Sequence, residues 1–170
     1  PKAVADEVKE ILVTFGGVDP SDQSFRLYNI LLGEAHRGTS RKIVLGKGYH
    51  GALLHVRSSE DFEIVRDTTQ ISRYMERADI AITSKGRTIY ELAKCGVPTL
   101  SISQNDREQR HDFGQVHFKD LGLHSEVSDT EIELALQEMM SDVSMRRNLS
   151  HNSRAISFDG IRNILSLIEE

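Results

Sequence analysis

The stretch "TSKGRTIYELAKCGVP" spans residues 83–98 and lies between two apolar runs. It opens with a small polar turn around Gly86, continues with apolar residues at helical spacing, and reaches Gly96, a residue typical of a helix end. The apolar runs on either side, residues 79–83 and 97–102, are short and mostly unalternating, as in strands buried on both faces. The stretch therefore predicts a strand, a helix and a second strand in succession.

The same alternation extends through most of the chain. Further strand-like runs lie at residues 11–15, 42–45 and 62–65, and helical patterns lie at residues 22–34, 71–77 and 88–94. Buried strands separated by helices predict an α/β fold, because parallel strands need crossovers and right-handed helical crossovers supply them. We expect a Rossmann-like parallel sheet with helices on both faces. Residues 129–170 show helical patterns only, which predicts terminal helices packing on the sheet.

Composition narrows the class of protein. The chain has 170 residues, 38% hydrophobic and 28% charged, which fits one globular domain. Its net charge of −5 argues against nucleic acid as a partner, because phosphate neutralisation needs a Lys and Arg excess. No apolar run approaches the roughly 20 residues of a membrane span, and no signal peptide is recognisable. With a lone Cys95, these features predict a cytoplasmic protein.

In such a sheet, ligands bind beyond the carboxyl ends of the strands, and the first loop to consider there is "FGGVDPSD", residues 15–22. Gly16 and Gly17 allow a ligand to approach the backbone closely, and Ser21 or Asp22 could cap the following helix. A phosphate would fit beside the free N–H groups of that helix. The alternative is a tight strand-to-helix turn in which acidic side chains repel phosphate.

The second loop is the polar turn of the opening stretch. Its backbone N–H groups, hydroxyls and two cations suit a pyrophosphate at a helix N-terminus; the residues are Ser84, Lys85, Gly86, Arg87 and Thr88. Glu91 follows on the same helix, and a carboxylate can accept hydrogen bonds from both hydroxyls of a ribose. Glu91 could instead only complement the helix dipole.

The third loop is "SQNDREQR", residues 103–110, which is rich in side chains that recognise hydroxyls and amides. The candidates for binding a sugar are Asn105, Asp106, Glu108 and Gln109. A solvated polar loop would have a similar composition, so this loop is informative only together with the other two.

Taken together, the Gly16-Gly17 turn, the "GRTIYELAKCGVP" stretch and the "NDREQ" loop resemble the C-terminal, nucleotide-sugar-binding half of glycosyltransferase-B folds. In particular, the pattern resembles the UDP-sugar hydrolase of pseudaminic acid biosynthesis and its spore-coat polysaccharide relatives. The N-acetylglucosaminyltransferase of peptidoglycan synthesis is more distant. In these relatives the first turn reads Gly-Gly-Ser-Asp-Pro, where this chain has Val18 in place of the serine. Lys85 and Arg87 also replace small residues.

The resemblance implies that residues 1–170 form a single nucleotide-sugar-binding domain, a fragment of a larger two-domain protein. Gly16, Gly17 and the second loop would face the diphosphate of a UDP-sugar, and Glu91 would bind its ribose. Asp106, Glu108 and Gln109 would lie near the donor sugar. The acceptor site and any catalytic base would come from the missing N-terminal domain, so we assign no catalytic residue and expect no separate cofactor. The whole protein would be a glycosyltransferase-like enzyme or a nucleotide-sugar hydrolase of surface polysaccharide or nonulosonic acid biosynthesis.

Two alternatives compete with this interpretation. "GKGYHG", residues 46–51, matches G-x-G-x-x-G after a strand, with Asp67 further on, as in an NAD-dependent oxidoreductase. The stretch that follows is too short for the full helix that this motif opens. A non-catalytic interaction or regulatory module is the other alternative, suggested by Val18, Lys85 and Arg87. The seven histidines form no ligand-like cluster, so we expect no metal.

Overall fold

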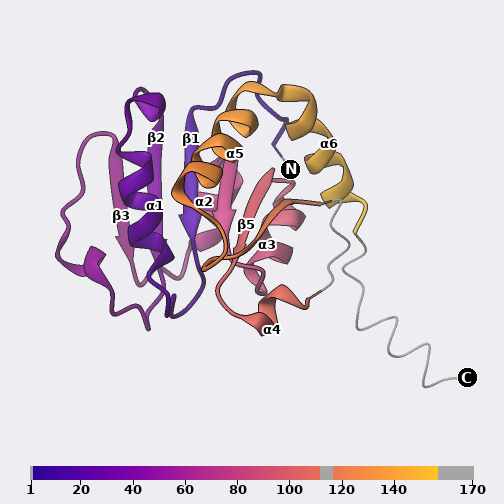
Figure 1. The fold of residues 1–170 in the computed structure, drawn as a ribbon. Coiled ribbons are helices and arrows are strands. Elements are labelled where there is room, and N and C mark those ends of the chain that lie inside the picture. Colours follow the sequence, from indigo (N-terminus) through magenta and orange to yellow (C-terminus); the bar gives the residue numbers. More distant parts are fainter. Residues whose placement is uncertain (1, 112–116, 157–170) are drawn as a thin grey trace, which may run out of the picture.

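In a computed structural model, which describes residues 2–111 and 117–156, six strands form one parallel sheet in the order β3-β2-β1-β4-β5-β6 (Figure 1). The strands are β1 (Glu10–Thr14), β2 (Ser40–Leu45), β3 (Phe62–Arg66), β4 (Ile80–Thr83), β5 (Thr99–Ser103) and β6 (Lys119–Leu123). The predicted α/β, Rossmann-like fold is confirmed, with all five expected strands present. β6 was missed by the sequence analysis.

The longer helices fall where the apolar periodicity places them. The helices are α1 (Gln23–Leu31), α2 (Ile71–Arg77), α3 (Thr88–Cys95), α4 (Asp106–Gln109), α5 (Asp129–Ser141) and α6 (Val143–Arg154), with short 3₁₀ turns η1 (Glu34–His36) and η2 (Ala52–His55). The short α4 lies within the segment predicted as the third polar loop. The predicted terminal helices are confirmed as α5 and α6, and the apolar segment expected near the C-terminus lies outside the described residues. No described helix has the length and apolar character needed to cross a membrane.

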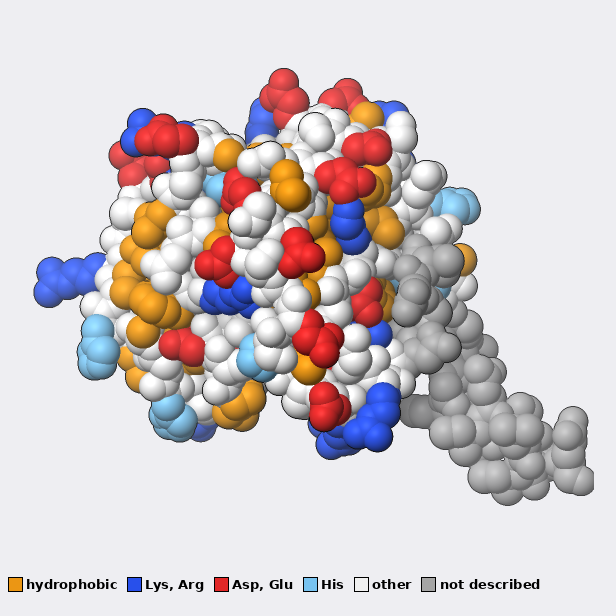
Figure 2. All heavy atoms as spheres, viewed as in Figure 1, with side chains coloured by type: hydrophobic (Ala, Val, Ile, Leu, Met, Phe, Trp, Pro, Cys, Tyr) orange, Lys and Arg blue, Asp and Glu red, His pale blue; other side chains and the backbone are white. Residues whose placement is uncertain are grey.

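Helices cover both faces of the sheet, as strand alternation requires. Ile11, Val13 and their neighbours on one face pack with apolar residues of α1 and α5. On the opposite face, Leu12 and Ala81 pack with α2 and α3 through Met75 and other residues. α6 contacts α3 and α5 at one side of the molecule. Figure 2 shows charged side chains of both signs scattered over the viewed face, without one basic stripe.

The residues before β1 are held against the rest of the fold by Lys2, Asp79 and Arg146. Lys2 Nζ lies 2.5 Å from Asp79 Oδ1, and Asp79 Oδ2 accepts from the backbone N–H groups of Lys9 and Glu10 at 2.8 and 2.9 Å. Burial alone would raise the pKa of Asp79, but the hydrogen bonds from Lys2 and the two amides outweigh it and lower the pKa below 3.8. The ionised carboxylate therefore stabilises the folded state.

This lowered pKa predicts a pH-dependent effect of Asp79→Asn. The stabilisation is fully present above the unfolded pKa and is lost as the pH falls through the lower, folded pKa. The stability difference between wild type and Asp79→Asn should therefore be large at pH 7 and shrink below about pH 4. Urea unfolding at a series of pH values measures it. A difference that stayed constant down to pH 2.5 would contradict the assignment.

Candidate functional site

The three predicted loops meet at the carboxyl edge of the sheet. They follow β1, β4 and β5, which are neighbours in the sheet. The chain passes from β1 outward to β2 on one side and from β4 outward to β5 on the other, so the strand order reverses between β1 and β4. In open parallel sheets this reversal point is where ligands bind.

Hydrogen bonds and close approaches bring the three loops together. Gln104, after β5, donates from Nε2 to Phe15 O at 3.3 Å and accepts from Ser21 Oγ at 3.1 Å. A methyl group placed on Gly16 would lie 3.8 Å from Thr88 Oγ1, so the first turn faces the start of α3. A methyl group on Gly86 would lie 3.5 Å from Glu108 Oε1, which brings the second loop to the third.

The first loop uses its own acid to cap α1. Asp19, which is buried, accepts hydrogen bonds from Gln23 N at 3.0 Å and Ser24 N at 2.8 Å. Burial raises the pKa of Asp19 against the lowering effect of these hydrogen bonds. The prediction that Ser21 or Asp22 caps α1 is wrong: Asp22 instead accepts from Tyr49 Oη and from Ala52 N. A carboxylate already occupies the N-terminus of α1.

The N-terminus of α3, in contrast, is open. α3 has no side-chain cap, and no described residue accepts a hydrogen bond from the backbone N–H groups of Gly86, Arg87 or Thr88. Two fully buried hydroxyls at the adjacent strand ends, Thr83 Oγ1 and Ser103 Oγ, also have no partner among the described residues. Alternation along β4 and β5 places both on the face that α3 covers. The donors gathered here suit an anion.

The two cations of the second loop have different surroundings. Lys85 is buried, and its Nζ lies 2.8 Å from Asp120 Oδ2 on β6 and 3.3 Å from Gln109 O. Arg87 is exposed and has no ion pair or hydrogen bond through its side chain with any described residue. Of the two side chains, only that of Arg87 is free of protein partners in the described part of the chain.

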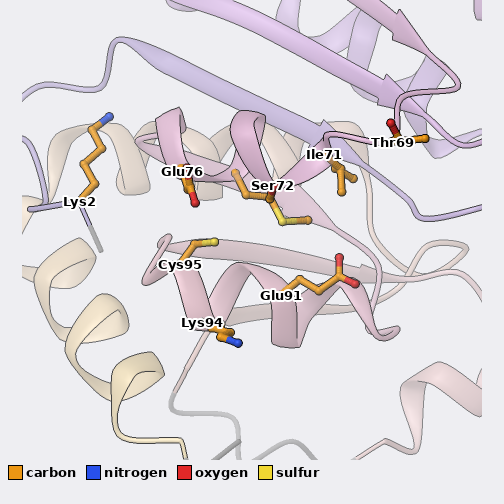
Figure 3. Close-up of a pocket in the computed structure, with 9 residues that line it drawn as sticks. Lys2, Thr69, Ile71, Ser72, Glu76, Glu91, Lys94 and Cys95 are labelled. Carbon is orange, nitrogen blue, oxygen red and sulfur yellow. The ribbon is translucent and has the colours of Figure 1, made fainter.

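Glu91 lies in a groove between α2 and α3, shown in Figure 3. The groove has a volume of about 820 Å³ and is lined by Lys2, Thr69, Ile71, Ser72, Met75, Glu76, Glu91, Lys94 and Cys95. Glu91 is exposed and pairs with no described residue. Because α2 and α3 both begin at the carboxyl edge of the sheet, Thr69 and Glu91 lie toward the edge that carries the three loops. Lys2 and Cys95 lie toward the other end of the groove (Figure 3).

The third loop is organised by its own side chains. Asn105 caps α4 by accepting from Glu108 N at 3.0 Å, and Glu108 Oε2 accepts from Gln104 N at 2.8 Å. Asp106 and Gln109 are exposed at the surface of α4. Glu108 therefore faces the second loop, near Gly86, while Asn105 holds the backbone of α4.

The glycines of "GKGYHG" are explained by packing. A side chain at Gly46 would overlap the backbone of Gly16 and Gly17, and Gly48 N donates to Gly17 O at 2.9 Å. A side chain at Gly51 would overlap Asp22 and Tyr49. The motif leads into the four-residue turn η2 and not into a full helix. Its glycines thus let β2 and its loop approach the first turn closely, which argues against an NAD site here.

Sequence reasoning missed two residues that organise the site. Asp120 is a lone acid in a polar stretch that did not read as a strand, and only the fold brings it to Lys85. Gln104 belongs to the polar third loop but is not among the candidates named there, and its two contacts join loops far apart in sequence. Among the described residues, no group of three or more His, Cys, Asp or Glu is placed to hold a metal ion.

Two curated proteins are similar to this chain in sequence. No family model matches the chain. It is 28% identical over 109 residues, 61% of this chain, to an uncharacterized protein of Methanocaldococcus jannaschii, covering 22% of that protein. It is 24% identical to the spore coat polysaccharide biosynthesis protein SpsG of Bacillus subtilis, over 96% of this chain and 51% of SpsG.

Solved structures show the same fold. Acinetobacter baumannii MurG matches with a TM-score of 0.68 and 15% identity over 97% of this chain and 50% of MurG. Anabaena HepE, solved in complex with UDP-glucose, matches with a TM-score of 0.64 and 14% identity over 86% of this chain and 43% of HepE. The chain therefore has the fold of about half of each of these two proteins. The chain spans about half the length, or less, of the relatives it matches.

Proposed function

We propose that this chain binds a nucleotide-diphospho-sugar, with a UDP-sugar as the leading candidate. The observation that carries the proposal is the open N-terminus of α3. Three backbone N–H groups and the Arg87 side chain, none of them paired with a described residue, belong to one turn at the end of β4. Together with the two buried hydroxyls at the neighbouring strand ends, they are the donors that would hold a diphosphate. The backbone of Gly16 and Gly17 in the first turn would lie beside the same anion. The N-terminus of α1, which follows this turn, is already capped by Asp19.

Glu91 is the residue proposed to bind the ribose of the nucleotide. It lies three residues after Thr88, so both side chains are on the same side of α3, about one turn apart. A diphosphate at the helix N-terminus would therefore place an attached ribose near the Glu91 carboxylate, which can accept from both ribose hydroxyls. The groove between α2 and α3 would hold the nucleoside. Glu108, facing Gly86, would lie on the sugar side, with Asp106 and Gln109 nearby.

Within the whole protein, we propose that this domain is the donor-binding half of a glycosyltransferase-like enzyme or of a nucleotide-sugar hydrolase. Support comes from the similarity to SpsG and from the UDP-glucose named for the HepE structure. A role in surface polysaccharide or nonulosonic acid biosynthesis, and a cytoplasmic location, stay predictions. The acceptor site and the catalytic base are expected from the other half of such an enzyme.

Calorimetric titration of this chain with UDP, UDP-N-acetylglucosamine, CMP and NAD tests the ligand class. We expect heat of binding with both uridine nucleotides and weaker or no binding of CMP and NAD. Tight NAD binding without a response to UDP would refute the proposal. A folded chain that binds none of the four would favour the non-catalytic module.

Glu91→Ala should weaken UDP binding by about 1.5–3 kcal/mol, because hydrogen bonds to a charged group are lost. The matched control is Glu76→Ala, which removes an exposed acid from the same groove nearer its other end (Figure 3). That variant should bind UDP as wild type does. Equal affinities of wild type and a folded Glu91→Ala variant would remove Glu91 from the site.

A further inference from the structure

The second loop contains a buried ion pair that ties it to the edge of the sheet. Lys85 lies between Ser84 and Gly86, in the turn that supplies the unpaired N–H groups, yet its ammonium group is directed to Asp120 on β6. The exposed fractions of the two side chains are 4% and 14%. An ion pair this far from water is not screened like a surface pair, and removing one partner leaves the other charge buried.

Asp120 connects several segments through its two oxygens. Oδ2 receives the Lys85 ammonium, and Oδ1 accepts from Ser101 Oγ at 2.9 Å and from Gly122 N at 3.2 Å. The Lys85 ammonium also donates to the carbonyl of Gln109 at the end of α4 at 3.3 Å. The pair therefore joins the β4–α3 turn to β5, β6 and α4. The buried charge of Lys85 is therefore already compensated by the protein, and it does not need an anionic ligand as a partner.

Arg87 provides the contrast within the same turn. It is exposed and no described residue pairs with its side chain, so its charge is available to an anion. Lys85 could turn toward an anion only by leaving the buried Asp120 carboxylate without its counter-ion, which is unfavourable.

We propose that Lys85 and Asp120 act as a positioning pair for the proposed site: they fix the backbone of residues 84–88 so that its N–H groups converge on the diphosphate, and Lys85 does not touch the ligand. The inference rests on the proposed function, because it assigns a role within that site. It also assigns the cationic contact with the diphosphate to Arg87.

A double-mutant cycle tests the pair. Affinities of this chain for UDP and for uridine are measured by calorimetry in wild type, Lys85→Met, Asp120→Asn and the double variant. We expect each single variant to lose UDP affinity by about tenfold or more, and the double variant to lose no more than either single one, because all three lack the same pair. Uridine affinity should stay near wild type, since uridine carries no phosphate, and Lys85→Arg should recover most of the UDP affinity.

Direct contact of Lys85 with the anion gives a different pattern. Lys85→Met would then lose UDP affinity while Asp120→Asn, which frees the lysine, would keep or increase it, and this result would overturn the proposal. Parallel loss of UDP and uridine affinity would also overturn it, because the effect would then be general destabilisation. Arg87→Met serves as the comparison. Its loss of UDP affinity should add to that of Asp120→Asn and diminish at high salt.

A ligand-free measurement separates this inference from the proposed function. If wild type binds no UDP, the proposed function fails, and the positioning role is then judged from amide resonances of the folded variants. Lys85→Met and Asp120→Asn should each shift the signals of Gly86, Arg87 and Thr88, while signals of α1 stay in place. Unchanged signals of the turn in both variants would refute the positioning role.

Discussion

Arg146→Ala is expected to lower the free energy of unfolding by about 3 kcal/mol, because one buried and three part-buried backbone carbonyls lose the guanidinium that donates to them. Arg146 is fully buried, and its guanidinium donates to Met139 O and Met140 O at 2.7 and 2.8 Å. It also donates to Ala5 O and Asp6 O at 2.9 and 2.7 Å. One side chain thus joins the residues before β1 to the α5–α6 corner. Urea unfolding followed by circular dichroism measures the loss.

The neighbouring Arg147 is the matched control for Arg146. It lies on the same helix and pairs with the Asp6 carboxylate at 2.7 Å, but both side chains are largely exposed. Arg147→Ala should therefore change the free energy of unfolding by no more than about 1 kcal/mol, as for other surface ion pairs. If both variants lost the same free energy of unfolding, the burial of Arg146 would not strengthen its attachment of the residues before β1.

Strand prediction is least ambiguous where burial is complete, and it failed at one half-buried edge strand. β4 and β5 are buried along their whole length, so their residues are nearly all apolar or small and the pattern is unambiguous. β6, with the sequence KDLGL, is an edge strand whose residues are all half-buried, and it includes Gly122 in a left-handed conformation. Its pairing with β5 is also irregular near Ser101. A strand that mixes charges with glycine carries no period that a single sequence could reveal.

The sequence predicted which loops form the candidate site. It did not predict which side chains pair within it. Loops after β1, β4 and β5 must converge once the sheet is parallel, so the meeting of Gly16, Thr88 and Glu108 required only the strand order. Which acid caps α1 depends on the left-handed conformation of Asp19 and Asp22, which is uncommon for residues other than glycine. The Lys85–Asp120 pair depends on β6, which the sequence analysis missed. Two side chains that are 35 residues apart in sequence produce no local sequence pattern that would reveal their pairing.

The second large effect is expected for Gly46→Ala, which should lower the free energy of unfolding by about 3 kcal/mol through overpacking. The added methyl group would lie 2.5 Å from Gly17 Cα and would also overlap the Gly16 carbonyl oxygen, so backbone atoms would have to move. The movement displaces the first turn itself. UDP affinity should therefore fall together with stability, as measured by urea unfolding and calorimetry on the same preparation.

Gly17→Ala separates the packing of this turn from its proposed contact with ligand. A methyl group on Gly17 meets no atom within 4 Å, and Gly17 does not have a positive φ, so stability should change by less than about 0.5 kcal/mol. If a diphosphate approaches the backbone here, the same methyl group occupies its space, and UDP affinity should fall by about tenfold or more. Full UDP affinity in Gly17→Ala would mean that the first turn serves only to connect β1 to α1. The anion would then be held by the N-terminus of α3 alone, because Asp19 already occupies that of α1.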